Sequence, residues 1–311
     1  MNRENATDRR AERHTTKTTA VLCGVGAYVI WGLVPLYFKQ VASIGALAIL
    51  AHRVIWSVVF LAILVTTQHL WSEVLRCFRS RTLLLMLAGS TFAVAINWFT
   101  FIFAISTGRI LQSSLGYFVT PLANVALGVI VLGERLRRWQ IVGLCLAGVG
   151  VSVQILATRS LPWIALLLAV SFSSYALLRK QMGVGPLIGG IVETMLLLPF
   201  GLFVAILRAR HDALAGAIDS RVYALLPIAG LVTAIPLLLF ARATRTLRLS
   251  TMGFLQYLSP TGQFLLAIFV YHELISQQKL LSFVLIWLAL LIYSLDSWQG
   301  LRRPAPVFVQ S

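Results

Sequence analysis

The chain has 311 residues, of which 59% are hydrophobic and only 12% are charged, and its mean hydropathy is +0.86. Soluble domains are nearer half apolar and a quarter charged, so this composition excludes a soluble globular protein. The net charge of +16 would suggest a nucleic-acid partner in a soluble chain, but the lysines and arginines stand in short clusters between apolar runs. Such clusters are typical of the signals that orient membrane helices. We therefore expect a lipid bilayer, and no nucleic acid, as partner.

Ten apolar stretches in chain order predict an all-α integral membrane protein. They cover residues 20–39, 46–67, 82–106, 110–132, 139–157, 160–178, 186–207, 222–243, 249–271 and 279–298. Most have the roughly 20 residues that a helix needs to cross a hydrocarbon core about 30 Å thick. Strands are excluded as the main element, because lipid satisfies backbone groups only in helices or closed barrels and the stretches lack barrel alternation.

The first stretch follows a basic, mostly polar segment and is longer than the apolar region of a signal peptide, so we expect a retained anchor helix. If the N-terminus lies inside, 18 of the 26 lysines and arginines fall on the inner side and seven on the outer side. This bias predicts a multi-pass membrane protein with both termini in the cytoplasm. The expected divisions are an N-terminal tail (1–19), a five-helix repeat (20–157), a second five-helix repeat (160–298) and a C-terminal tail (299–311).

Two segments of the chain resemble each other. The first, 113–121, contains Ser-Leu-Gly-Tyr-Phe and ends at Pro121, and the second, 250–260, contains Met-Gly-Phe-Leu-Gln-Tyr and ends at Pro260. A glutamate, Glu134 or Glu273, follows each proline after 13 residues. Five helices per half is an odd number, so the second half must cross the membrane upside down. The sequence thus predicts ten transmembrane helices in two inverted five-helix repeats, an arrangement typical of transporters.

Glycine and proline within these segments predict interruptions of the two helices. The expected break positions are Gly116, Pro121, Gly253 and Pro260. Carbonyl groups freed at such positions can face a cavity, which Tyr117, Gln256 and Tyr257 would then line with aromatic and polar groups. A kink that allows close packing is the alternative, because glycine and proline are common in transmembrane helices.

Three ionisable side chains, His52, Arg53 and Glu193, fall inside apolar stretches. Each is costly in lipid and should face protein or water. Arg53 and Glu193 lie on helices that are counterparts in the repeat, and a bridge between them is geometrically feasible. They are interpreted either as groups that hold or gate a polar substrate, or as a buried ion pair that fixes helix register. Glu193 is also the first candidate for proton coupling and His52 the second.

Other polar and aromatic residues are weaker candidates. Asn97, Trp98 and Trp31 could line a cavity, although an interhelical hydrogen bond explains Asn97 equally well. Glu134 and Glu273 are expected to have structural roles at the N-termini of the helices that follow them.

The order and spacing of several motifs resemble the drug/metabolite transporter superfamily, its EamA-domain branch and, within it, the RarD subfamily of bacterial permeases. The motifs are His52-Arg53-Val54-Ile55-Trp56-Ser57, Asn97-Trp98, Leu115-Gly116-Tyr117-Phe118, Gly133-Glu134-Arg135, Glu193-Thr194, Leu197-Leu198-Pro199, Pro236-Leu237, Leu249-Ser250-Thr251, Gly253-Phe254 and Gln256-Tyr257. This resemblance covers residues 20–298. It implies ten helices in inverted halves, a location in the bacterial inner membrane with both termini inside, and export of small molecules. One departure is that Tyr271-His272-Glu273 stands where the first half has Gly133-Glu134.

The function expected from the sequence is a secondary permease that exports small organic molecules by alternating access, with protons as the candidate coupling ion. An uncoupled exchanger or importer and a non-transport scaffold or sensor are the alternatives. Motifs for serine hydrolases, Walker-type nucleotide binding and zinc proteases do not occur, so we expect no enzyme. No cysteine pair has metal-ligand spacing, and we expect no cofactor. The chain is expected to be a monomer or a homodimer.

Overall fold

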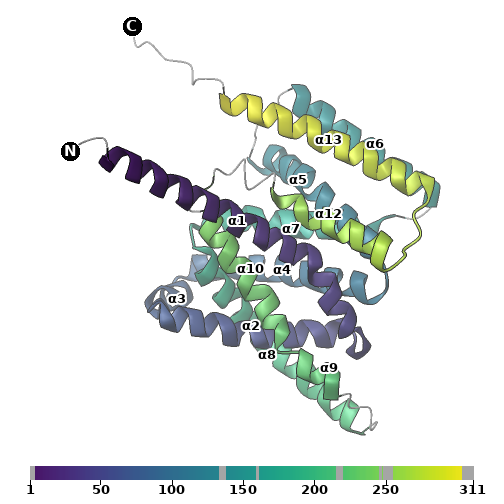
Figure 1. Ribbon diagram of the computed structural model, residues 1–311. Helices are drawn as coiled ribbons and strands as arrows, with labels where there is room; N and C mark the ends of the chain where they lie inside the picture. Colours follow the sequence, from purple (N-terminus) through teal and green to yellow (C-terminus); the bar gives the residue numbers. More distant parts are fainter. Residues whose placement is uncertain are drawn as a thin grey trace.

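The computed structural model describes residues 4–132, 138–158, 161–214, 220–244, 247 and 255–302, and within these ranges it contains helices and no strand (Figure 1). The helices are α1 (Glu4–Gln40), η1 (Ala42–Ile44), α2 (Ala46–Thr67), α3 (Trp71–Arg79), α4 (Arg81–Ser106), α5 (Ile110–Leu132), α6 (Arg138–Thr158), α7 (Trp163–Met182), α8 (Pro186–Leu214), α9 (Ser220–Leu225), α10 (Ile228–Thr244), α12 (Leu258–Leu265), η2 (Leu266–Val270) and α13 (Gln277–Arg302). The prediction of an all-helical chain is confirmed.

Each of the ten apolar stretches contains a helix, although several boundaries differ from those expected. The first helix extends back to Glu4, through most of the expected N-terminal tail. The connection after α2 contains an additional amphipathic helix, α3, which buries Val74 and Cys77. Only nine residues long and polar on one face, α3 gives no long apolar run, which is why hydropathy did not reveal it.

Five helical segments in the described residues are long and apolar enough to cross a membrane. They are Thr18–Gln40, Ala46–Thr67, Arg81–Ser106, Pro186–His211 and Ser220–Phe240. Shorter apolar helices cover Arg138–Val153, Trp163–Arg179, Leu258–Val270 and Gln277–Ile292. Crossing by all ten stretches stays a prediction.

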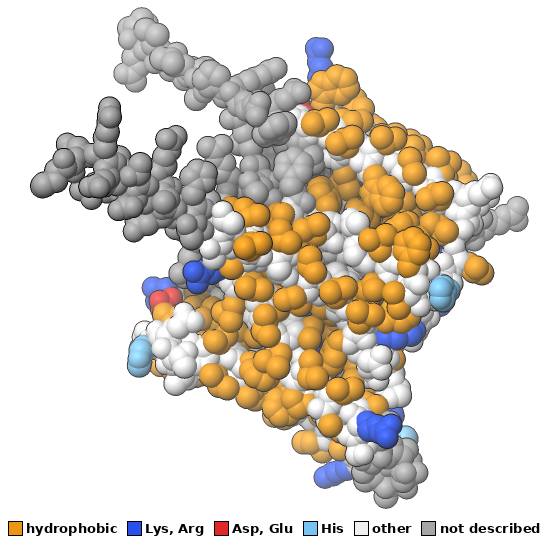
Figure 2. All heavy atoms as spheres, in the orientation of Figure 1, with side chains coloured by type: hydrophobic (Ala, Val, Ile, Leu, Met, Phe, Trp, Pro, Cys, Tyr) orange, Lys and Arg blue, Asp and Glu red, His pale blue; other side chains and the backbone are white. Residues whose placement is uncertain are grey.

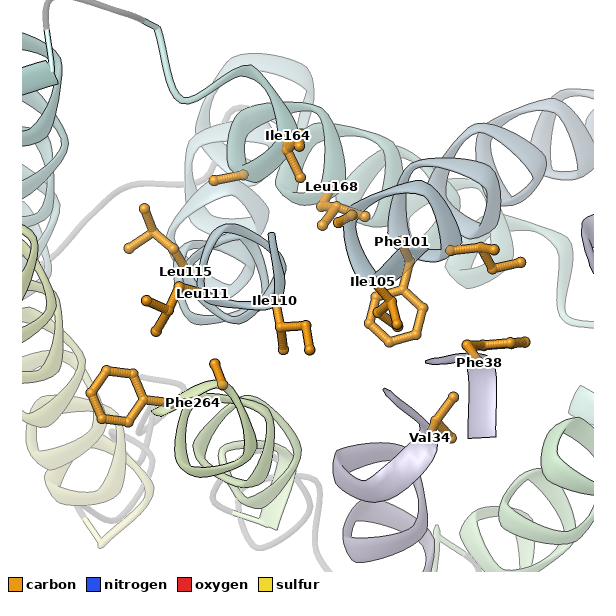
Figure 3. Close-up of a cluster of buried hydrophobic side chains, with 14 of the residues drawn as sticks. Val34, Phe38, Phe101, Ile105, Ile110, Leu111, Leu115, Ile164, Leu168 and Phe264 are labelled. Atoms are coloured by element: carbon orange, nitrogen blue, oxygen red, sulfur yellow. The ribbon is translucent and has the colours of Figure 1, made fainter. Parts of the chain in front are cut away.

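The helices pack in pairs that join distant parts of the chain. α6 packs against α13, α5 against α7 and α12, α2 against α8 and α10, and α1 against α10 and α12. The largest buried cluster lies where α1, α4, α5, α7 and α12 converge, and includes Phe38, Ile105, Ile110, Leu168 and Phe264 (Figure 3). This core fixes α5 in contact with both halves of the chain.

Hydrophobic side chains also cover most of the outer face seen in Figure 2, while lysines and arginines lie toward its periphery. Large apolar residues such as Phe92 and Phe269 are 70% and 71% exposed. So large an exposed apolar surface is suited to lipid rather than water. The first turns of α1 and the last turns of α13 lie at the same side of the molecule in Figure 1.

Candidate functional site

Arg53 and Glu193 lie on α2 and α8, which pack against each other in antiparallel directions. A Cβ atom on Gly201 would lie 3.3 Å from the carbonyl oxygen of Ala51, and one on Gly190 would lie 3.7 Å from Leu61. Interpolation between these two contacts puts Arg53 opposite a position on α8 about six residues, or about 9 Å, from Glu193. The two charged groups do not pair, and each has partners of its own.

Arg53 lies among aromatic side chains. Its guanidinium carbon is 4.1 Å from the ring centre of Trp98 and 5.6 Å from that of Phe38. Its Nε donates a hydrogen bond of 3.2 Å to the hydroxyl of Thr233 on α10. Within the described part of the chain, Arg53 forms no ion pair with a carboxylate. The cation is therefore held by π faces and one neutral acceptor.

Next to this group, Asn97 joins α4 to α5 and α7. Its side chain is 2% exposed, and its Nδ2 donates to the carbonyl of Leu168 and the hydroxyl of Ser171, at 3.0 and 3.1 Å. Its Oδ1 accepts a hydrogen bond of 3.2 Å from the hydroxyl of Tyr117, which lies within electrostatic range of Arg53. Of the two interpretations of Asn97, the structure places it in an interhelical hydrogen-bond network, while Tyr117 and Trp98 remain partly accessible.

Glu193 is the centre of a second polar group, which is almost completely buried. Its carboxylate accepts hydrogen bonds from Ser90 on α4, at 2.7 Å, and from Tyr175 on α7, at 3.4 Å. A guanidinium nitrogen of Arg179 lies 3.8 Å from the carboxylate, and the side chains of Glu193 and Arg179 are only 4% and 13% exposed. The partner of Glu193 is thus Arg179, and the carboxylate links three helices.

In the sequence, Arg179 counts among the basic residues of an inner connection, whereas in the structure its side chain is largely buried beside Glu193. Arg179 lies inside α7, and its Nη2 donates to the carbonyls of Val184 and Gly185, at 3.3 and 3.1 Å. Gly189 leaves the space for its guanidinium, because a Cβ atom there would overlap it. The sequence contained one indication of this space: Gly189 precedes Glu193 by one helical turn, so both residues lie on one face of α8.

The first repeated segment does not break its helix. α5 is continuous from Ile110 to Leu132, through both Gly116 and Pro121. A Cβ atom on Gly116 would lie 2.9 Å from the carbonyl oxygen of Ala165, so the glycine allows close packing of α5 on α7. Of the two interpretations of this segment, close helix packing therefore describes Gly116 better than a helix break that lines a cavity.

The second segment does interrupt its helix in the residues described. Leu255 and Gln256 are helical, Tyr257 forms a turn, and α12 starts at Leu258 with Pro260 in its first turn, where a missing N–H is tolerated. The two segments are in contact, because the hydroxyl of Ser114 donates a hydrogen bond of 2.8 Å to the carbonyl of Pro260. Gly253 lies outside the described residues.

The comparison with known proteins agrees with this architecture. The EamA-like transporter family matches residues 18–156. An uncharacterized transporter of Pseudomonas aeruginosa is 44% identical over 287 residues, covering 91% of this chain and 96% of the relative. Protein RarD of Escherichia coli K12 is 42% identical over 284 residues, covering 91% and 96%. This chain belongs to the EamA family of drug/metabolite transporters, with the RarD proteins.

A solved crystal structure with 16% sequence identity matches the fold of this EamA transporter with a TM-score of 0.55, covering 89% of this chain and 98% of that one. At that identity the likeness concerns the fold alone. Family membership and the apolar helices together identify a multi-pass membrane transporter of the drug/metabolite type, whose partners are a small-molecule substrate and the bilayer.

The remaining candidates of this transporter lie outside the two polar groups. His52 makes an edge contact with Tyr223, with ring centres 6.1 Å apart, and Trp31 packs against Phe240 at 5.9 Å. Gln256 is partly accessible. Tyr257 packs at the edge of the main core. The structure therefore does not bring all predicted cavity residues together.

Glu273 has a structural role, but at a different helix from the expected one. Its two carboxylate oxygens accept hydrogen bonds from the backbone N–H groups of Ile110 and Leu111, at 2.6 and 3.0 Å. It therefore caps α5, in the other half of the chain, rather than α13. Burial raises the pKa of Glu273, while these two hydrogen bonds, with Lys279 and Lys39, oppose that shift. Glu134 lies outside the described residues.

Proposed function

We propose that this protein is a secondary transporter of the bacterial inner membrane that exports small organic molecules by alternating access, in exchange for protons. The observation that carries the proposal is the separation of two charged groups within antiparallel apolar helices: Arg53 beside Trp98 and Thr233, and the buried Glu193 beside Arg179. Charged side chains within apolar helices are costly, and they are retained where they serve a substrate or ion pathway.

The packing of the helices supports two inverted halves. If α1, α2, α4, α5 and α6 correspond to α7, α8, α10, α12 and α13, the most extensive contacts between helices have counterparts. The pair α5–α7 corresponds to α12–α1, α4–α7 to α10–α1, and α4–α8 to α10–α2. The pairs α2–α8, α5–α12 and α6–α13 map onto themselves. With five helices per half, this exchange supports ten spans in an inverted repeat with both termini on the same side. The distribution of lysines and arginines favours the cytoplasm as that side.

Glu193 has the surroundings of a proton-coupling group. When ionised, its carboxylate attracts Arg179 and accepts the hydrogen bonds of Ser90 and Tyr175. When protonated, it loses the charge that holds the guanidinium, so the contact between α7 and α8 weakens. Protonation would thereby shift the equilibrium between two arrangements of these helices, which is the requirement for coupling.

Export from loaded vesicles tests this function. Proteoliposomes are loaded with the small-molecule extract of bacterial cytosol, a pH gradient is imposed, and the compounds released are identified by mass spectrometry against empty liposomes. We expect release of a defined set of compounds that is accelerated by the gradient, and loss of that acceleration in Glu193→Gln. Glu273→Gln is the matched control, because its carboxylate lies outside the membrane-spanning helices.

The outcomes separate the alternatives. Release that ignores the pH gradient would contradict proton exchange and favour an uncoupled exchanger. Accumulation inside right-side-out vesicles without release would favour an importer. Identical contents in protein-containing and empty liposomes would contradict transport and favour a scaffold or sensor.

A further inference from the structure

The guanidinium of Arg53 has hydrogen-bonding capacity that the protein does not use. Nε donates to Thr233. The two terminal nitrogens donate to no group in the described part of the chain, where Arg53 makes no other hydrogen bond or ion pair. Neither nitrogen is among the buried, unpartnered polar atoms, so both retain accessible surface. Both nitrogens are thus free to donate to a further hydrogen-bond acceptor.

Among the residues that the structure describes, no carboxylate is placed to neutralise this cation. Of the ten acidic residues in the chain, only Glu193 and Asp296 fall within the apolar stretches. Glu193 is about 9 Å away along the helix axes and is already engaged by Arg179, Ser90 and Tyr175. Asp296 is on α13, which packs against α6 and α5 rather than α2. An arginine retained in an apolar helix without an anionic partner lacks the compensation that such residues normally have.

We propose that Arg53 is the anchor for the anionic group of the transported molecule, and that the substrate is an organic monocarboxylate with an apolar body. This rests on the proposed function, since it names the substrate class of that transporter. The terminal nitrogens of arginine form a fork that matches the two oxygens of a carboxylate. One cation balances one negative charge, which favours a monocarboxylate over a dianionic phosphate ester.

The groups around the fork match the rest of such a molecule. The ring centre of Trp98 lies 4.1 Å from the guanidinium carbon, and Thr233 accepts the hydrogen bond of Nε. Trp98 and Tyr117 are both partly accessible, so they present aromatic surface near the guanidinium. An apolar or aromatic body would contact these rings while its carboxylate occupies the fork.

Binding by the purified full-length protein tests the anchor without requiring transport. Thermal unfolding is followed in detergent with benzoate, its neutral counterpart benzamide and the dianion phenyl phosphate as probes. We expect benzoate to raise the unfolding temperature and benzamide to leave it unchanged. Arg53→Gln should abolish the benzoate effect, and Arg53→Lys should weaken binding by about tenfold or more, because a point charge cannot form two parallel hydrogen bonds.

Arg109→Gln is the matched arginine control and should retain the benzoate effect, because Arg109 is an exposed cation beside an aromatic ring, that of Phe103. Equal stabilisation by benzoate and benzamide, or by neither, overturns the proposal on the wild-type protein alone, even if the Arg53 variants do not fold. Stronger binding of phenyl phosphate overturns the monocarboxylate assignment. Counterflow of radiolabelled benzoate in proteoliposomes separates the two proposals. Binding that depends on Arg53 but is not accompanied by flux would contradict transport and support Arg53 as the anchor. Flux that does not depend on Arg53 would contradict the anchor and support transport.

Discussion

Replacement of Gly189 by alanine should disconnect Arg179 from Glu193. The added methyl group would occupy the position of the Arg179 guanidinium, which now lies 3.8 Å from the Glu193 carboxylate. The guanidinium must then move away from that carboxylate. Breaking a buried ion pair costs about 3–5 kcal/mol, and the lower end applies because Ser90 and Tyr175 still donate to Glu193. Alanine returns up to about 1 kcal/mol in helix propensity. The net loss of unfolding free energy should be about 2 kcal/mol.

The neighbouring glycine provides the control. A Cβ atom on Gly190 meets its nearest atom, in Leu237, at 3.5 Å, which is an ordinary contact, so Gly190→Ala should be neutral or slightly stabilising. Unfolding in mixed detergent micelles would be measured for both variants, alone and combined with Glu193→Gln. In the Glu193→Gln background the cost of Gly189→Ala should largely disappear. If Gly189→Ala is as stable as Gly190→Ala, or costs the same in both backgrounds, the assigned role of the ion pair is refuted.

Three further predictions concern other contacts. Gly230→Ala should lower the unfolding free energy by about 1–3 kcal/mol, because its Cβ would lie 2.6 Å from the carbonyl oxygen of Trp56. Gly148→Ala should not lower it, because a Cβ there has no neighbour within 4 Å. Equal unfolding temperatures of the two variants would contradict this prediction. Since burial raises the pKa of Glu273, its contribution to stability is largest below the unfolded-state pKa and declines as the pH rises through the folded-state pKa. The wild-type unfolding temperature should therefore fall more between about pH 4 and pH 7 than that of Glu273→Gln, and parallel profiles would count against the shift. His272 has a φ of 51°, a backbone conformation that is strained for residues other than glycine. His272→Gly should therefore raise the unfolding free energy by up to about 1 kcal/mol, and His272→Ala should not. Thermal unfolding measures both, and a gain with alanine would exclude backbone strain as the reason.

The departure from the repeat at His272 shows how sequence and structure complement each other. The sequence shows that histidine stands where the first half has a glycine before its glutamate. The structure shows that this residue has the left-handed backbone conformation that favours glycine, and that the following carboxylate still reaches a helix N-terminus. The turn keeps its conformation because Glu273, through the hydrogen bonds to Ile110 and Leu111, is held from outside the segment.

Arg53 and Glu193 could be identified from the sequence as charges within apolar helices, because a charged residue in an apolar stretch is recognised from its neighbours along the chain. Their partners could not be identified in that way. Arg179 follows an apolar stretch and precedes Lys180, a pattern that also describes a surface anchor, and Thr233 has no local signal at all. The distinction depends on whether α8 offers a space at Gly189 and on how α10 packs against α2.

The amino-acid sequence by itself determined the all-helical membrane class, the positions of the apolar helices and the family, because hydropathy and motif order depend on residues that are close in the chain. Only the tertiary structure decided which charges meet, that Gly116 serves helix packing and that Glu273 caps a helix in the other half. These outcomes depend on distances between helices that are far apart in the chain. Such distances are set by side-chain packing across the whole bundle rather than by any local pattern.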